Sequence, residues 1–449
     1  MSKWYETAAF YHIYPLGMSG APRRNTEPGI QHRFPKLETW LPHIRKLGCE
    51  AIYIGPLFES TSHGYDTIDY KLVDRRLGDN EDFVHFVKAA HELGQKIVVD
   101  GVFNHTGREF PGFADIQKNR ENSRYCGWYK GINFGWNSAY NDGFGYETWR
   151  GCGDLVNLNL QNQEVKNYLF EVIRFWIHEF DIDGIRLDCA DCLDFEFMKE
   201  MRRMTENEKK DFWLMGEVIH GDYSRWANPE MLHSVTNYEL SKGLYSGHND
   251  HNYFEIAHTI CRQFDENGGI YRDRVLYSFL DNHDVSRIVN KLNNRQHLIP
   301  AYGLVYTLPG LPSIYYGSEW GVEGRKEEGD DALRPCLDPD ELEKNPPVPG
   351  LAEWIAFLGK CRMENPVLAE GRYRELLLTN RQYAFARLNE SEAVVTAVNN
   401  DDQDADLWIR LPMAAEKLTD LKTEEALEAE NGQLHILVPA NGCRLIRLN

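Results

Sequence analysis

The chain has 449 residues, of which 42% are hydrophobic, and its formal net charge is −20. This length suffices for one large domain and a smaller one, and the acidic excess argues against nucleic acid or an anionic membrane as partner, because both attract basic surfaces. The start of the chain has no apolar leader and no apolar run of about 18 residues follows, which predicts a cytoplasmic protein. Its nine cysteines are odd in number and scattered, as is typical of reduced thiols.

Short apolar runs alternate with helical patterns up to residue 365. The runs predict eight strands, at Ala9–Tyr14, Ala51–Ile54, Lys96–Asp100, Gly184–Leu187, Trp213–Gly216, Ser234–Asn237, Val275–Leu280 and Pro312–Tyr315. Helices are predicted at Leu37–Leu47, Glu81–Leu93, Gln163–Phe180, Phe195–Met204, Tyr253–Phe264, Gln296–Leu308 and Leu351–Cys361. This alternation predicts an α/β fold, a (β/α)8 barrel. A doubly wound open sheet is the alternative, but no G-x-G-x-x-G motif follows a strand.

Two segments interrupt or end this alternation. Residues 106–159 are rich in Gly, Asn, Trp and Tyr without a clear period, and so long a loop in a compact domain is usually functional. After residue 365 the pattern predicts short antiparallel strands, at Arg372–Leu378, Tyr383–Arg387, Ala393–Asn399, Asp406–Leu411, Leu434–Val438 and Arg444–Leu448. We therefore expect a barrel at 1–105 and 160–365, an inserted domain B at 106–159, and a C-terminal β-sandwich at 366–449.

Acidic residues stand where several of the predicted strands end. Asp188, Glu217 and Asp284 each follow an apolar run, and Asn104-His105 lies just beyond the strand that ends at Asp100. The carboxyl ends of the strands form the active-site face of a (β/α)8 barrel. Carboxylates that converge there are typical of enzymes that break glycosidic bonds.

Each of these residues, taken alone, has a second interpretation. Arg186 and Asp188 share one face of a strand, so the guanidinium would keep a nucleophilic carboxylate ionised, or the two would form a structural pair. Glu217 is either a protonated general acid in a partly dry site or a solvated loop residue. Asp284 is either a ligand for sugar hydroxyls or a helix N-cap, and Tyr65 either stacks on a sugar ring or packs on the rim.

Taken together, six short motifs resemble those of the α-amylase family, glycoside hydrolase family 13. They are Asp100-Gly-Val-Phe-Asn-His105, Val156-Asn-Leu-Asn159, Gly184-Ile-Arg-Leu-Asp188, Gly216-Glu-Val218, Asn282-His-Asp284 and Gly310-Leu-Pro-Ser-Ile-Tyr-Tyr-Gly-Ser-Glu319. The resemblance extends over residues 9–365 and includes the C-terminal β-domain.

The resemblance implies a retaining double displacement on an α-glucan. Asp188 would be the nucleophile, Glu217 the acid and base, and Asp284 the stabiliser of the transition state. The implied substrate-binding residues are Tyr65, His105, Arg186, His283, Asp330 and Arg334, with Asp331 as a neighbouring alternative to Asp330.

The residues after Asp188 indicate a branch of the family. Asp191 and Cys192 replace the Lys-His pair of many endo-acting amylases, and the segment resembles the cyclomaltodextrinase, neopullulanase and maltogenic amylase branch. That branch usually has an N-terminal β-domain that builds a dimer, whereas this chain starts almost at the first strand, so a monomer is expected. The rival functions are a glucanotransferase, which acceptor-site aromatics such as Trp226 would favour, and a non-catalytic glucan-binding relative.

A calcium ion is the one cofactor that the resemblance raises. In many amylases the residue that matches Asn104 binds calcium, but the Asp partner expected from domain B is Asn157 here. An amide is a weaker ligand for a hard cation than a carboxylate. We therefore expect no required metal or other cofactor.

Overall fold

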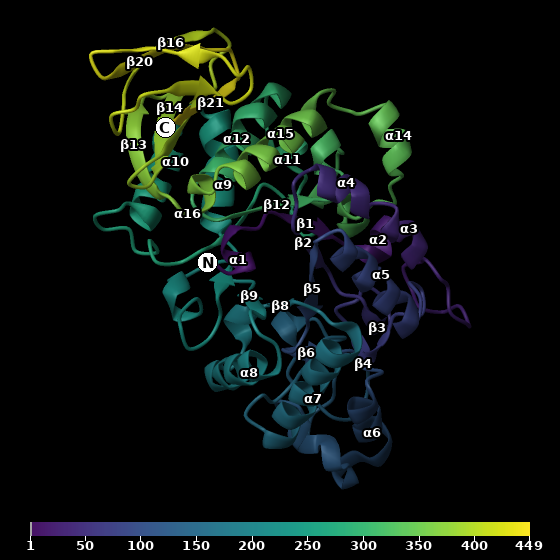
Figure 1. Ribbon diagram of the computed structural model, residues 1–449. Helices are drawn as coiled ribbons and strands as arrows, with labels where there is room; N and C mark the ends of the chain where they lie inside the picture. The colour runs from purple at the N-terminus through teal and green to yellow at the C-terminus, as the bar shows by residue number, and fades with distance from the viewer. Residues whose placement is uncertain (1) are drawn as a thin grey trace.

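The computed structural model describes residues 2–449, and its centre is a closed parallel β-barrel (Figure 1). Its strands are β1 (Phe10–Ile13), β2 (Ala51–Ile54), β5 (Lys96–Gly101), β8 (Gly184–Leu187), β9 (Trp213–Gly216), β10 (Ser234–Val235), β11 (Tyr277–Phe279) and β12 (Leu311–Tyr315). They pair in the order β10-β9-β8-β5-β2-β1-β12-β11. A parallel bridge between Thr236 and Tyr277 joins the two ends. The predicted (β/α)8 barrel is confirmed.

Alternation along the strands explains why the interior of the barrel is apolar and its face at the carboxyl ends of the strands is polar. Phe10, Trp213 and Tyr277 belong to the buried cluster inside the barrel, and Tyr5 of α1 (Trp4–Thr7) joins that cluster. Since every second residue points to the same face, the position two beyond Met215 on the same face is occupied by Glu217. The same spacing that fills the core therefore aims polar side chains at the carboxyl ends of the strands.

Helices surround the barrel, and all of the long ones except α9 were predicted. The long ones are α5 (Asn80–Glu92), α7 (Gln163–Phe180), α8 (Phe195–Glu208), α9 (Tyr238–Asn249), α10 (Tyr253–Phe264), α12 (Leu298–Thr307) and α15 (Leu351–Glu364). The short ones are α2 (Pro15–Ser19), α3 (Phe34–Glu38), α4 (Leu41–Lys46), α11 (Ile288–Lys291), α13 (Asp330–Leu333), α14 (Pro339–Lys344) and α16 (Val367–Glu370). No helix within residues 2–449 is both long and apolar enough to cross a bilayer.

Two helix predictions need correction. The single helix expected at Leu37–Leu47 is two helices, α3 and α4, and Pro42 stands at the start of the second, where proline is favoured. The helix α9 was not predicted, because its glycines and polar residues weaken the helical pattern. It begins at an Asn237 side chain that accepts a hydrogen bond from the Leu240 N–H, and its apolar face is buried.

Between β5 and α7 the chain leaves the barrel for a segment with little regular structure. It is anchored by an antiparallel pair, β6 (His105–Thr106) with β7 (Val156–Asn157), and it contains α6 (Pro111–Asn119). Single 3₁₀ turns complete it, at Arg120–Asn122, Arg124–Trp128 and Trp149–Gly151. A separate hairpin, β3 (Phe58–Ser60) with β4 (Thr67–Val73), follows β2 and carries Tyr65 in its turn.

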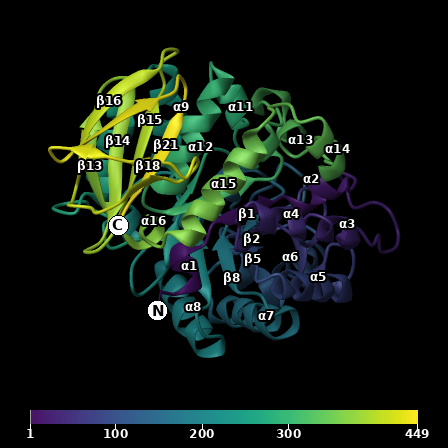
Figure 2. The same cartoon turned by 45° about the horizontal axis from the view of Figure 1, so that its top comes forward.

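The C-terminal part is an antiparallel β-domain, as predicted. A six-stranded sheet contains β13 (Arg372–Leu378), β14 (Gln382–Leu388), β15 (Ala393–Asn399), β21 (Cys443–Leu448), β17 (Leu418–Asp420) and β18 (Ala426–Leu427). A second sheet contains β16 (Ala405–Arg410), β20 (Gln433–Val438) and β19 (Ala429–Glu430). An apolar cluster lies between them, and Figure 2 shows the domain beside α9 and α12. The strands β17, β18 and β19 were missed because two or three residues carry no alternation.

Candidate active site

The guanidinium of Arg186 is the centre of the polar cluster at the carboxyl ends of β5, β8 and β9. Its Nη1 lies 2.9 Å from Asp100 Oδ1 and 2.9 Å from Asp188 Oδ1, and its Nη2 lies 2.9 Å from Glu217 Oε2. Asp100 also accepts hydrogen bonds from Tyr53, at 2.8 Å, and from Tyr65, at 3.2 Å. One buried cation therefore holds three carboxyl groups from adjacent strands, and Glu217 is not a solvated loop residue.

Further contacts fix Glu217. Its Oε2 accepts the Cys189 backbone N–H at 3.1 Å, and its Oε1 lies 3.4 Å from the Tyr238 hydroxyl. The Tyr238 hydroxyl in turn accepts a hydrogen bond from Asn282 Nδ2 at 3.0 Å. Tyr238 was not among the predicted site residues, so its contact with Glu217 was missed.

Asp284 belongs to a second cluster. Its two oxygens lie 2.9 Å from His283 Nε2 and 3.0 Å from Arg334 Nη2. The Tyr65 hydroxyl is 2.5 Å from the same His283 nitrogen, and the two rings stack with centroids 5.7 Å apart. Asp330 lies 3.4 Å from Arg334. At the start of helix α11 the Ile288 N–H donates to Asp281 Oδ2 instead, so Asp284 is not the N-cap.

The wall of a cavity of about 610 Å³ begins at this second cluster. Tyr14 lines the cavity. The guanidinium carbon of Arg334 lies over its ring, 4.5 Å from the centroid. Asp330 and Asp331 both line it, but Asp331 pairs with Arg23 at 2.5 Å and not with Arg334. Between the two candidates, Asp330 is therefore the one that contacts Arg334.

The pKa values of Asp188 and Asp284, one in each cluster, are shifted in opposite directions. Burial raises the pKa of Asp188 to about 7; Arg186 opposes this shift, and Glu217 and Asp100 add to it. The expectation that Arg186 keeps Asp188 ionised therefore overlooks burial, which outweighs the effect of the guanidinium on the pKa. For Asp284, burial is outweighed by His283, Arg334 and Arg186, which hold its pKa below the usual range.

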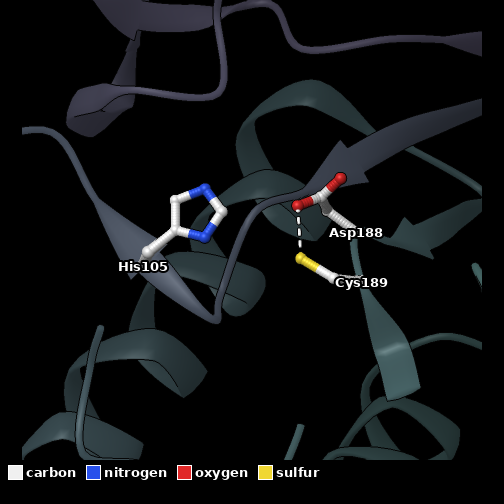
Figure 3. Close-up of side chains that lie close together, drawn as sticks. All are labelled: His105, Asp188 and Cys189. Carbon is white, nitrogen blue, oxygen red and sulfur yellow. Dashed lines mark hydrogen bonds between the residues drawn. The ribbon is translucent and has the colours of Figure 1, made fainter. Parts of the chain in front are cut away.

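His105 faces Asp188 from β6 across the site (Figure 3). Its side chain is buried, which lowers the pKa of the imidazole to about 3, so the ring is neutral. Its Nδ1 lies 3.2 Å from Asn104 Nδ2, and no hydrogen-bond partner lies near its Nε2. A buried nitrogen without a partner in this position is available to a bound ligand.

The residues implied for calcium do not fit a calcium ion well. Asn104 Nδ2 donates to Asn157 Oδ1 at 3.3 Å, so the oxygen of Asn157 already has a partner. The pair offers amides and no carboxylate, whereas calcium sites are built from six to eight oxygens that usually include carboxylates.

One predicted feature is corrected by burial. Trp226, suggested as an acceptor-site aromatic, is 5% exposed. Its ring packs edge-on against Phe195, with Arg225 above it at 5.0 Å. Since a sugar ring needs an open aromatic face, Trp226 gives no support to a transfer activity.

Comparisons with known proteins find related sequences and a similar overall structure. The family model described as Alpha amylase, catalytic domain, matches residues 37–346. The chain is 30% identical over 460 residues to a maltogenic α-amylase of Bacillus acidopullulyticus, covering 96% of this chain and 76% of that one. It is also 30% identical over 466 residues to neopullulanase 2 of Thermoactinomyces vulgaris, covering 97% and 76%. A solved cyclomaltodextrinase structure superposes with a TM-score of 0.88 at 26% identity, covering 99% of this chain and 78% of that one.

Proposed function

Because the chain belongs to the α-amylase family of glycoside hydrolases, we propose that it cleaves the α-1,4-glucosidic bonds of maltooligosaccharides, cyclodextrins or starch with retention. The observation that carries the proposal is the shared contact of Asp188 and Glu217 with Arg186. It places a candidate nucleophile and a candidate acid on adjacent strands of one site. The names of the relatives, which include maltogenic amylases, cyclomaltodextrinases and neopullulanases, support the substrate class.

In the proposed first step, Asp188 attacks the anomeric carbon while Glu217 protonates the leaving oxygen. The glycosidic C–O bond breaks, an ester bond to Asp188 forms, and the proton of Glu217 leaves with the released sugar. In the second step, Glu217 removes a proton from water, which attacks the same carbon and frees Asp188. Two displacements restore the α-configuration and return the proton to Glu217.

The excess of negative charge around Arg186 favours a proton on one of the neighbouring carboxyl groups, as the proposed first step requires. Asp100, Asp188 and Glu217 bring three negative charges to a buried site whose one close cation is Arg186. Like charges in contact do not all ionise together, and two interacting carboxyl groups titrate as a pair. The proposed mechanism requires that Asp188 be ionised while Glu217 carries a proton.

The second cluster is suited to hold the sugar. Asp284 is ionised and 37% exposed, so its oxygens can accept bonds from sugar hydroxyls and oppose the positive charge of the transition state. His105 and His283 offer ring nitrogens, and Arg334 with Asp330 extends the polar wall. Tyr65 is 9% exposed and one face of its ring stacks on His283, which leaves only the other face for a sugar. Substrate binding by these residues is part of the proposal.

Product analysis tests the proposal. The purified protein is incubated separately with maltotriose, β-cyclodextrin, pullulan and soluble starch, and the products and their anomeric form are followed over time. Release of α-anomeric maltose or glucose supports it, with Asp188→Asn as the inactive control. Release of β-anomers would overturn the retaining mechanism, and longer chains from maltotriose would identify a glucanotransferase.

A further inference from the structure

One residue contacts both candidate catalytic carboxyl groups. Cys189 follows Asp188 directly and adopts the left-handed conformation, with φ 37° and ψ 52°, which is uncommon for a residue other than glycine. Its backbone N–H donates to Glu217 Oε2 at 3.1 Å, and its thiol donates to Asp188 Oδ2 at 2.8 Å. Figure 3 shows the sulfur directed at the carboxylate, with the imidazole of His105 beside both groups.

The environment of Cys189 makes the thiol a hydrogen-bond donor. The residue is 4% exposed, and burial together with the charge of Asp188 raises the pKa of the Cys189 thiol well above its ordinary value. The sulfur therefore keeps its hydrogen at neutral pH. A protonated thiol is a weak donor and a weak acceptor, and beside an ionised carboxylate the donor role is favoured.

The two oxygens of Asp188 are both occupied as a result. Arg186 holds Oδ1 from β8 at 2.9 Å, and the thiol holds Oδ2. Asp100 on β5 and Glu217 on β9 add negative charge, and the imidazole of His105, on β6, is neutral. Donors on both oxygens favour the ionised form of Asp188 and so oppose burial, which raises the pKa of this carboxyl.

Glu217 is held less completely. Its Oε2 accepts from Arg186 and from the Cys189 N–H, at 2.9 and 3.1 Å, but its Oε1 has only the 3.4 Å contact with the Tyr238 hydroxyl. A proton on Oε1 displaces no strong donor. The difference between the two carboxyl groups is thus set on the Asp188 side by the thiol.

We propose that Cys189 is a positioning residue whose thiol occupies the second oxygen of Asp188 and thereby directs the proton of the carboxyl pair to Glu217. This inference rests on the proposed function, because it assigns the nucleophile and the acid within the same site. It also gives the residue after Asp188 a role that depends on its side chain.

Three variants test it. Cys189→Ala removes the donor, Cys189→Ser keeps one, and both retain the Cβ and so the same backbone strain. The control is Cys192→Ala, which removes an exposed thiol whose contact is Asp191 at 3.6 Å. The readout is kcat/KM on maltotriose from pH 4.5 to pH 9.

In Cys189→Ala we expect the acidic limb of the profile to move up by roughly half to one pH unit. At pH 5.5 the rate then falls about three- to tenfold, while at pH 8 it changes little. Cys189→Ser and Cys192→Ala should follow the unmodified protein. An unmoved acidic limb in Cys189→Ala, or equal shifts in Ala and Ser, would overturn the inference.

Thermal unfolding reports on the ionisation of Asp188 without requiring catalysis. Between pH 5 and pH 8, Cys189→Ala should lose stability more steeply than Cys192→Ala, because ionising Asp188 without the thiol costs more. If the protein cleaves no α-glucan, the proposed function fails while this comparison still applies. Equal slopes in the two variants would overturn the role of Cys189.

Discussion

The two polar clusters of the site differ in burial and in the balance of charge. The Arg186 cluster places three carboxyl groups on one cation, and the side chains of Asp188 and Glu217 are each 12% exposed. The Asp284 cluster gives one carboxylate two nitrogen-bearing partners, and Asp284 is 37% exposed. The first arrangement has an excess of negative charge that a proton relieves, and the second keeps its carboxylate ionised. A retaining glycosidase needs both kinds of carboxyl group within one site.

The largest expected effect on activity comes from a change in the Arg186 cluster. Asp188→Asn keeps the shape of the side chain but cannot form the glycosyl ester, so we expect kcat/KM on maltotriose to fall by roughly 10⁴-fold or more. Circular dichroism provides the control that the variant folds. Activity within tenfold of the unmodified protein would exclude Asp188 as the nucleophile.

A change in the Asp284 cluster is expected to have a smaller effect on activity. Arg334→Ala removes one partner of Asp284 and so raises the pKa of that carboxyl, although His283 still holds it. We expect kcat/KM at pH 6 to fall by roughly ten- to a hundredfold, since a hydrogen bond to a charged group contributes about 1.5–3 kcal/mol. Arg23→Ala, which breaks an exposed ion pair on the wall of the same cavity, is the matched control and should leave the rate within twofold. If both variants behave alike, Arg334 has no special relation to Asp284.

The two clusters should also differ in how their contribution to stability depends on pH. Asp188 has a pKa raised to about 7, so its contribution to folding is favourable below its unfolded pKa and is lost as pH rises through 7. Asp284 has a lowered pKa, so its contribution is present above the unfolded pKa and is lost only as pH falls. At pH 8, Asp188→Asn should therefore raise the unfolding temperature by a few degrees and Asp284→Asn should lower it, as scanning calorimetry can measure. A change of the same sign in both variants would refute the contrast.

The sequence predicted the positions of these residues better than their environments. The end of each strand was recognisable, so Asp188, Glu217 and Asp284 were expected on one face of a barrel. The depth at which Asp188 is buried was not recognisable, and burial outweighs the expected effect of Arg186 on its pKa. The contacts of Tyr238 and Cys189 depend on how neighbouring strands align, which no single segment contains.

The same limit applies to the segment between β5 and α7 and to α9. The segment lacks a period because its backbone is held by side-chain contacts and short antiparallel pairs, of which β6 with β7 is one. Helix α9 contains Gly243 and Gly247, which disfavour a helix when considered alone. Packing against α10 outweighs that cost, and packing cannot be predicted from local propensity.

The smallest expected effect concerns calcium, at the boundary between the barrel and this segment. Asn104 and Asn157 bond to each other there at 3.3 Å, so a direct hydrogen bond already joins the two parts. We expect EDTA treatment to leave both kcat/KM and the unfolding temperature unchanged, with a calcium-dependent amylase treated in parallel as the positive control. An unfolding temperature that falls with EDTA and recovers with calcium would show that a cation links the segment to the barrel. In that case the amide pair would have to separate to admit the ion, and Asn157→Asp, which supplies a carboxylate, should then bind it more tightly.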